Sequence, residues 1–185
     1  MSFLKKIVHQ YFTASLLACC TILFSAQTQI AREYQVKAVF LFNFSQFVEW
    51  PATSFQNSNA LVIGILGEDP FGAYLDEAVR GEEVNGHPLV VSRYKHIDDV
   101  KACHILFINA AETHQLKQVF ASLKSRSILT VSDSDNFTKQ GGMIKFFTEN
   151  NKTRIRINLD ATRDANLTIS SKLLRLADIV GSTHN

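Results

Sequence analysis

The chain has 185 residues, of which 46% are hydrophobic and 19% are charged. This composition is typical of one globular domain, and it excludes a disordered or fibrous chain. The formal net charge is +2, but Lys5 and Lys6 lie at the extreme N-terminus, and the rest of the chain carries 17 basic and 17 acidic side chains. Because nucleic-acid binding depends on neutralising many phosphates, this balance argues against nucleic acid as a partner.

The first 26 residues have the order of a secretory signal peptide. A basic start at Lys5 is followed by a largely apolar stretch over residues 13–24 and then by the small residues Ser25 and Ala26. We therefore expect a signal peptide over residues 1–26 that is cleaved after Ala26. Two alternatives are a retained N-terminal anchor and a lipoprotein, since residues 16–19 (LLAC) resemble a lipobox.

Strand and helix patterns alternate along the rest of the chain. The first helix is predicted over Glu33–Trp50 and ends at Pro51. Its apolar residues cover most of its circumference, so it is either sandwiched between other elements or partly exposed for a partner. A buried strand is predicted at Leu61–Leu66. A helix then runs from Asp69-Pro70 to about Arg80, with Asp69 as its N-cap and proline in its first position.

Five further strands and three helical segments complete the pattern. The strands are predicted at Leu89–Tyr94, His104–Asn109, Ile128–Ser132, Met143–Thr148 and Arg154–Ile157. The last two strands form a hairpin that turns at Asn150-Asn151. The helical segments are predicted at Ile97–Lys101, Glu112–Ser125 and Ala161–Val180, the last with a break near Asn166 and a new cap at Ser170.

These elements predict an α/β fold in a single domain over residues 27–185. Strands that alternate with helices favour a mostly parallel sheet with helices on both faces. The sheet is expected to have about six strands. Its antiparallel hairpin should lie at one edge, because Arg154–Ile157 alternates as a half-exposed strand does.

In folds of this class, ligands bind beyond the carboxyl ends of the parallel strands. Polar or small residues follow three of the predicted strands: Gly67, Glu68, Asp69, Asn109, Asp133 and Ser134. They define a candidate ligand crevice. This crevice is assigned by analogy between folds, whereas function depends on the residues of the site.

No pattern in the chain predicts catalysis, a cofactor or a metal site. The glycines follow no phosphate-binding motif, no Gly-x-Ser-x-Gly sequence occurs, and the histidines lack metal-ligand spacing. Cys103 and His104 are adjacent on a strand and point to opposite faces, so they do not form a catalytic pair. Once the signal peptide is removed Cys103 is the only cysteine, so stability should not depend on reductant.

A series of motifs runs in order from about Tyr34 to Val180. They include residues 37–44 (KAVFLFNF), 47–51 (FVEWP), 61–72 (LVIGILGEDPFG), 103–108 (CHILFI), 129–133 (LTVSD) and 169–174 (ISSKLL). Together they resemble the YfiR family of bacterial periplasmic proteins. The signal peptide agrees with such a family independently of these motifs.

The resemblance implies a non-catalytic periplasmic repressor. Such a protein binds the periplasmic sensor region of an inner-membrane diguanylate cyclase and holds it inactive, which lowers cyclic di-GMP and biofilm formation. An outer-membrane lipoprotein can sequester the repressor. The candidate surface for a partner or a homodimer comprises Phe42, Phe44, Phe47, Trp50, Ile169, Leu173 and Leu174, for which core packing is the alternative.

A second hypothesis comes from a different class of protein. The same sheet could be a periplasmic small-molecule binding module that uses the candidate crevice and reports to another membrane sensor such as a histidine kinase. A ligand that binds only the folded state would raise the melting temperature, which distinguishes the two hypotheses.

Overall fold

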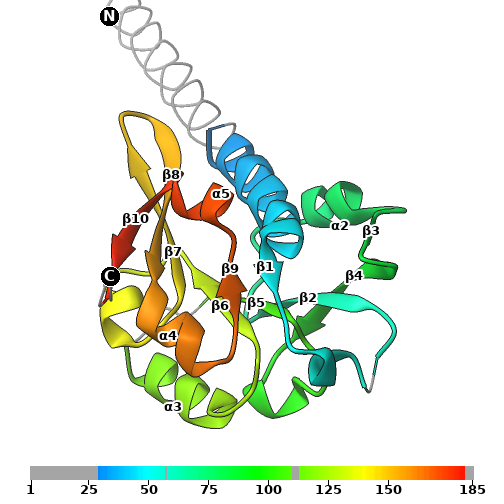
Figure 1. The fold of residues 1–185 in the computed structure, drawn as a ribbon. Helices are drawn as coiled ribbons and strands as arrows, with labels where there is room; N and C mark the ends of the chain where they lie inside the picture. The colour runs from blue at the N-terminus through cyan, green and yellow to red at the C-terminus, as the bar shows by residue number, and fades with distance from the viewer. Residues whose placement is uncertain (1–28, 57, 110–112, 182–185) are drawn as a thin grey trace, which may run out of the picture.

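The computed structural model describes residues 29–56, 58–109 and 113–181. The expected signal peptide lies outside these residues. Most strands form one eight-stranded sheet in the order β10-β8-β7-β6-β5-β2-β4-β3 (Figure 1). Their bounds are β2 Leu61–Leu66, β3 Glu83–Val84, β4 His87–Tyr94, β5 Ile105–Ile108, β6 Leu129–Ser132, β7 Ile144–Glu149, β8 Lys152–Asn158 and β10 Ala177–Val180.

The centre of the sheet is parallel, as expected. Strands β4, β2, β5, β6 and β7 are parallel neighbours, and only the pairs β3/β4 and β7/β8 are antiparallel. Every residue of β2, β5 and β6 is buried, which explains why these strands are continuous apolar runs rather than alternating ones. Helix α2 (Ala73–Val79) connects β2 to β4, and helix α3 (Thr113–Leu123) connects β5 to β6.

Helices cover both faces of the sheet, which confirms the predicted fold class. Alternate residues of a strand point to opposite faces, and in β5 Ile105 and Phe107 belong to one apolar cluster while Leu106 and Ile108 belong to another. The first cluster is covered by an N-terminal helix (residues 29–47), by α2 and by α5 (Ser171–Leu174). The second is covered by α3.

The N-terminal helix ends three residues earlier than predicted. Val48–Glu49 forms strand β1, which pairs antiparallel with β9 (Thr168–Ile169) in a small separate sheet. The amide of Ser170 also donates a hydrogen bond to the carbonyl of Phe47, at 2.8 Å. These long-range pairings end the helix before Pro51 can.

The prediction of a helix over Ala161–Val180 is wrong at Thr168–Ile169 and Ala177–Val180, which form strands. Helix α4 (Leu159–Asp164) is followed by β9, α5 and the strand β10. The predicted break is present at Asn166, where φ is 56°, and Ser170 caps α5 by accepting a hydrogen bond from the amide of Lys172. Because β10 pairs with β8, the β7/β8 hairpin does not lie at the sheet edge as expected.

Two tight hairpin turns use asparagine at positive φ, and the one at Asn150-Asn151 was predicted. The β7/β8 hairpin turns at Asn150-Asn151, where φ is 50° and 58°, and the short β3/β4 hairpin turns at Asn85-Gly86, where φ is 53° and 81°. Positive φ at both central residues defines the type I′ turn that suits the twist of a hairpin. Within the described residues, no helix is both long enough and apolar enough to cross a membrane.

Cys103 is expected to be chemically inert in the folded protein. Its side chain is buried on the α3 side of the sheet, its thiol donates to the carbonyl of Ile105, and burial raises its pKa to about 12. The thiolate is the reactive form, so a thiol reagent such as Ellman's reagent should react only when the protein unfolds. Dithiothreitol should leave the melting temperature of the mature protein unchanged. Rapid labelling of the native protein, or a lower melting temperature in dithiothreitol, would contradict this assignment.

Candidate functional site

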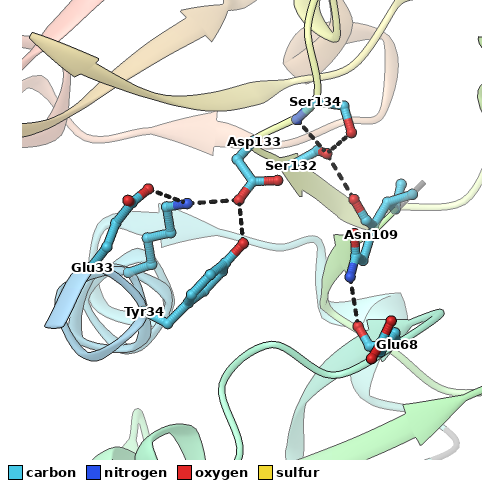
Figure 2. Close-up of polar contacts among 9 residues, drawn as sticks. Glu33, Tyr34, Glu68, Asn109, Ser132, Asp133 and Ser134 are labelled. Carbon is cyan, nitrogen blue, oxygen red and sulfur yellow. Dashed lines mark hydrogen bonds and ion pairs between the residues drawn. The ribbon is translucent and has the colours of Figure 1, made fainter. Parts of the chain in front are cut away.

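The six residues of the candidate crevice lie at one end of the parallel strands, on three neighbouring elements. The segment 67–69 follows β2, Asn109 follows β5, and the segment 133–134 follows β6. Figure 2 shows that they do not converge on one point, because Asp133 turns toward the N-terminal helix while Asn109 reaches the loop after β2. The structure therefore divides the predicted crevice into separate parts.

The strand order creates a switch point between β2 and β5. From β2 the chain passes over one face through α2 to β4, and from β5 it passes over the opposite face through α3 to β6. Because the two connections leave in opposite directions, a crevice opens beyond the ends of β2 and β5, where ligands bind in doubly wound folds. A pocket of about 400 Å³ lies there, and Gly67 and Asn109 line it.

The two loops at the switch point are tied closely together. The Asn109 amide nitrogen donates to the carbonyl of Glu68 at 2.8 Å, as Figure 2 shows, and the Asn109 backbone N–H donates to the carbonyl of Leu66 at 3.0 Å. Gly67 has φ of 96°, and a Cβ there would lie 2.7 Å from the carbonyl oxygen of Asn109. Only glycine fits both the conformation and the contact. The mouth of the pocket is thus held in a fixed shape.

Five further polar residues line the pocket and were not predicted from the sequence: Lys95, His96, Asp98, Gln115 and Gln118. Lys95 and His96 follow the carboxyl end of β4, so the rule that selected Asn109 would have found them once β4 was placed beside β2. Gln115 and Gln118 are three apart on α3, which puts them on one face of that helix. Apolar residues such as Leu66, Ile108 and Val119 also line the pocket.

Asp133 belongs to a buried ionic cluster with the N-terminal helix. Lys37 is only 3% exposed, and its Nζ lies 2.6 Å from Asp133 Oδ2 and 2.7 Å from Glu33 Oε1. The hydroxyl of Tyr34 donates to the same Asp133 oxygen at 2.9 Å, and burial together with Asp133 raises the pKa of that hydroxyl (Figure 2). A buried ammonium requires paired acceptors, so this cluster fixes the helix to the end of β6.

A groove of about 560 Å³ runs beside this cluster. Glu33, Lys37 and Asp133 line it, and a second ion pair, the exposed Asp135 with the mostly buried Lys145 at 2.8 Å, also lines it. The cluster's lysine is already satisfied by two carboxylates, so the polar groups here hold the fold rather than present free donors.

Asp69 and Asp76 hold the loop after β2 to strand β4. One Asp69 oxygen accepts a hydrogen bond from the Phe71 amide and the other accepts from Arg93 Nε, both at 2.7 Å. Arg93 also pairs with Asp76 and lowers the pKa of that carboxyl. The predicted helix start at Pro70 is therefore wrong. Asp69 closes a turn that inserts Phe71 into the core, and α2 begins at Ala73.

Ser132 and Ser134 link the ends of β5 and β6. The hydroxyl of Ser132 donates to the carbonyl of Ile108 at 2.7 Å, and the backbone N–H of Ser134 donates to Ser132 Oγ at 3.1 Å (Figure 2). Neither serine lines the switch-point pocket. Their hydrogen bonds set the spacing of the two strand ends.

The candidate partner surface is divided by burial. Phe44 and Leu173 lie fully inside the core, so their side chains are not accessible to a partner. Phe42, Phe47, Trp50, Ile169 and Leu174 are half-buried and pack against the same core cluster. These five residues bring the end of the N-terminal helix together with β9 and α5.

Three exposed aliphatic residues near these elements were not predicted as a surface. Val36 and Val39 on the N-terminal helix are 46% and 51% exposed, and Leu176 after α5 is 63% exposed. A groove of about 440 Å³ lies between Val36 and the β7/β8 turn. Arg32 lines it from the N-terminal helix, and Lys152 lines it from the start of β8. The sequence did carry the signal, since the helix is apolar over more of its circumference than one buried face needs.

The fold and these surfaces define a single-domain, doubly wound α/β protein with exposed aliphatic side chains on its N-terminal helix. The sequence profile of the YfiR/HmsC-like family matches residues 34–178, which is more than half of the chain. The protein belongs to this family, as its motifs indicated. Members are known as periplasmic regulators of cyclic di-GMP signalling, and the family is regulatory rather than catalytic.

Other comparisons add little. No curated protein matches the chain. It resembles in fold a solved structure described as a conserved domain protein from Vibrio cholerae O1 biovar El Tor strain N16961, with 11% sequence identity and a TM-score of 0.47. The match covers 66% of this chain and 55% of that one. At this level the similarity carries no functional argument.

Proposed function

We propose that this protein is a periplasmic regulator that binds and represses an inner-membrane diguanylate cyclase, and so lowers cyclic di-GMP and biofilm formation. The observation that carries the proposal is the family match over residues 34–178. Repression requires the protein to bind the inactive state of the cyclase more tightly than the active state, which shifts the population toward the inactive state. Such a role needs a complementary surface and no catalytic group.

The N-terminal helix and the α5 region supply the surface in this proposal. Val36, Val39 and Leu176 expose aliphatic side chains to water, and the half-buried Phe42 and Trp50 add aromatic area nearby. Burial of such side chains at an interface is favourable, and aromatic residues are enriched among the residues that dominate binding energy. An outer-membrane lipoprotein that sequesters the repressor, or a second copy in a homodimer, would compete for the same surface.

Export is part of the proposal. Residues 1–26 would direct the chain to the periplasm and be removed, and the lipoprotein alternative would instead retain Cys19 as a lipid anchor. N-terminal sequencing of the protein released from the periplasm separates the two. A new N-terminus at Gln27 supports cleavage after Ala26, and a blocked, lipid-modified Cys19 overturns it.

The function is tested by measuring cellular cyclic di-GMP in a strain that lacks the gene. The level should rise in that strain and return when the chain is re-expressed with its signal peptide. A version without residues 2–26 is the matched control, because it should not be exported and should not restore the level. An unchanged level while the cyclases are expressed would overturn repression.

A second candidate function is favoured by the pocket at the switch point. It would bind a small polar molecule that accepts hydrogen bonds from Lys95, Gln115 and Gln118, and would report to another membrane sensor such as a histidine kinase. A screen of small carboxylic acids, amides and sugars should then contain a compound that raises the melting temperature. Replacing Gln118 with leucine should remove that rise while the unliganded protein keeps its stability. No rise with any compound in the screen would count against this function.

A further inference from the structure

His104 lies at the amino end of β5, on the opposite end of the sheet from the switch-point pocket, and its ring is enclosed by aromatic side chains. Its side chain is almost fully buried, with only 1% of the residue exposed. Phe55 stacks on the ring at 4.5 Å between centroids, and Trp50 meets it edge-on at 6.1 Å. His87 stacks on the far side of Phe55 at 4.0 Å. The rings of His87, Phe55 and His104 thus form one stack, and Trp50 closes it edge-on.

The hydrogen bonds of His104 are compatible only with its neutral form. The backbone N–H of Val62 donates to His104 Nδ1 at 3.0 Å, so Nδ1 must carry a lone pair and the proton of the neutral ring is on Nε2. Nε2 is buried and has no hydrogen-bond partner among the described residues. Protonation would place an N–H at Nδ1 against the N–H of Val62, so the charged ring would lose this hydrogen bond.

The segment of residues 50–55 depends on this ring. The indole N–H of Trp50 donates to the His104 carbonyl at 3.1 Å, and Phe55 ends the short 3₁₀ helix η1 (Ala52–Phe55), in which no residue is fully buried. This segment joins β1 to β2, so it lies between the N-terminal helix and the core of the sheet. A change at His104 can therefore be relieved by moving residues 50–55 rather than by unfolding β5.

We propose that His104 is an acid-sensitive latch: the neutral ring holds residues 50–55 against the sheet, and protonation releases them. The proposal stands on the enclosed ring, the Val62 hydrogen bond and the unpartnered Nε2. Two further groups act on the ring. His87, a titratable group, also opposes the charged form, whereas the nearby backbone of Ser54 favours the charged form.

The direction of the pH effect follows from burial. Burial lowers the pKa of His104 below the ordinary value of about 6.5, so the open or unfolded state takes up a proton before the closed state does. The latch is therefore fully closed above about pH 6.5 and opens as the pH falls below it. If the proposed function is also correct, acid would change the shape of the partner surface, because Trp50 belongs to that surface. That last step alone rests on the proposed function.

Trp50 is the only tryptophan in the chain, so its fluorescence reports on the latch directly. The emission of the folded, exported protein is recorded from pH 8 to pH 4, beside an NMR titration of the histidine ring protons. We expect a reversible change in Trp50 emission with a midpoint below pH 6.5, and the same midpoint for the ring of His104. His104→Asn places an amide oxygen near the position of Nδ1, keeps the acceptor for Val62, and should remove the transition.

His87→Asn is the matched control, since it removes the neighbouring titratable ring and should leave the transition in place. The latch is overturned if the transition persists in His104→Asn, or if it disappears in His87→Asn. If His104→Asn does not fold, the NMR titration of the unmodified protein decides: titration of His104 with no change at Trp50 rejects the latch. Binding to the cyclase sensor region at pH 7.5 and pH 5.5 is measured separately, so absence of binding at both pH values counts against the proposed function and leaves the latch standing.

Discussion

Replacement of Asp133 with alanine is expected to lower the free energy of unfolding by about 3 kcal/mol, because it removes one partner of a buried ion pair. Lys37 would keep Glu33, which is itself partly exposed, and would lose its closer acceptor. The hydroxyl of Tyr34 would lose the same acceptor. The loss should also loosen the N-terminal helix, since the cluster fixes that helix to the end of β6. Urea denaturation of the variant and the parent protein measures the change.

The same groove provides the control for this prediction. Asp135 pairs with Lys145 at a similar distance, but the Asp135 side chain is 97% exposed and water screens the pair, so Asp135→Ala should lower stability much less than Asp133→Ala does. Combining Asp133→Ala with Lys37→Met should recover most of the lost stability, because an apolar side chain then replaces the unpaired charge. Equal effects of Asp133→Ala and Asp135→Ala would show that the buried cluster does not hold the helix.

The interior of the sheet could be predicted because its signals are local. The buried runs of β2, β5 and β6 are bounded by turn residues, and each run is too short for a helix. Burial on both faces needs helices above and below, which led to the correct fold class. The asparagine turns were equally local, since positive φ favours asparagine and glycine.

The last part of the chain could not be predicted because its structure depends on distant partners. Strand β10 has four residues and pairs with β8, about twenty positions earlier, while β9 pairs with β1, more than a hundred positions earlier. Strand propensity depends strongly on such neighbours, so a short segment such as residues 177–180 carries no decisive pattern of its own. The helix predicted there was continued from the cap at Ser170, which in the structure starts only the short helix α5.

The sequence predicted which residues follow the strand ends, but it did not predict which side chains they contact. The strand ends were correct, but no sequence pattern predicts that Asp133 forms an ion pair with Lys37, which lies 96 residues away. One signal was present. Tyr34, Lys37, Leu41 and Phe44 follow helical spacing, so Lys37 falls on the buried face and needs a carboxylate from elsewhere in the fold.

The apolar N-terminal helix serves two roles that substitutions can separate. Phe44 lies in the core with no exposed surface, so Phe44→Ala should lower the free energy of unfolding by about 3–5 kcal/mol. Val39 is 51% exposed on the same helix, and Val39→Asp should change stability by no more than about 0.5 kcal/mol. Under the proposed function, however, a carboxylate at this position would be buried against the partner without an acceptor, which weakens binding.

The expected result for Val39→Asp is a stable protein that binds the cyclase sensor region about tenfold or more weakly, a loss of about 1.4 kcal/mol. Cyclic di-GMP should then stay high when this variant is the only copy in the cell. Ala121→Asp, at an exposed position of α3 on the other face of the sheet, is the matched control and should repress normally. Full repression by a stable Val39→Asp variant would remove the N-terminal helix from the interface and leave the exposed valines without a role in binding. Loss of repression by both aspartate variants would instead indicate that the added charge, rather than its place on the helix, caused the effect.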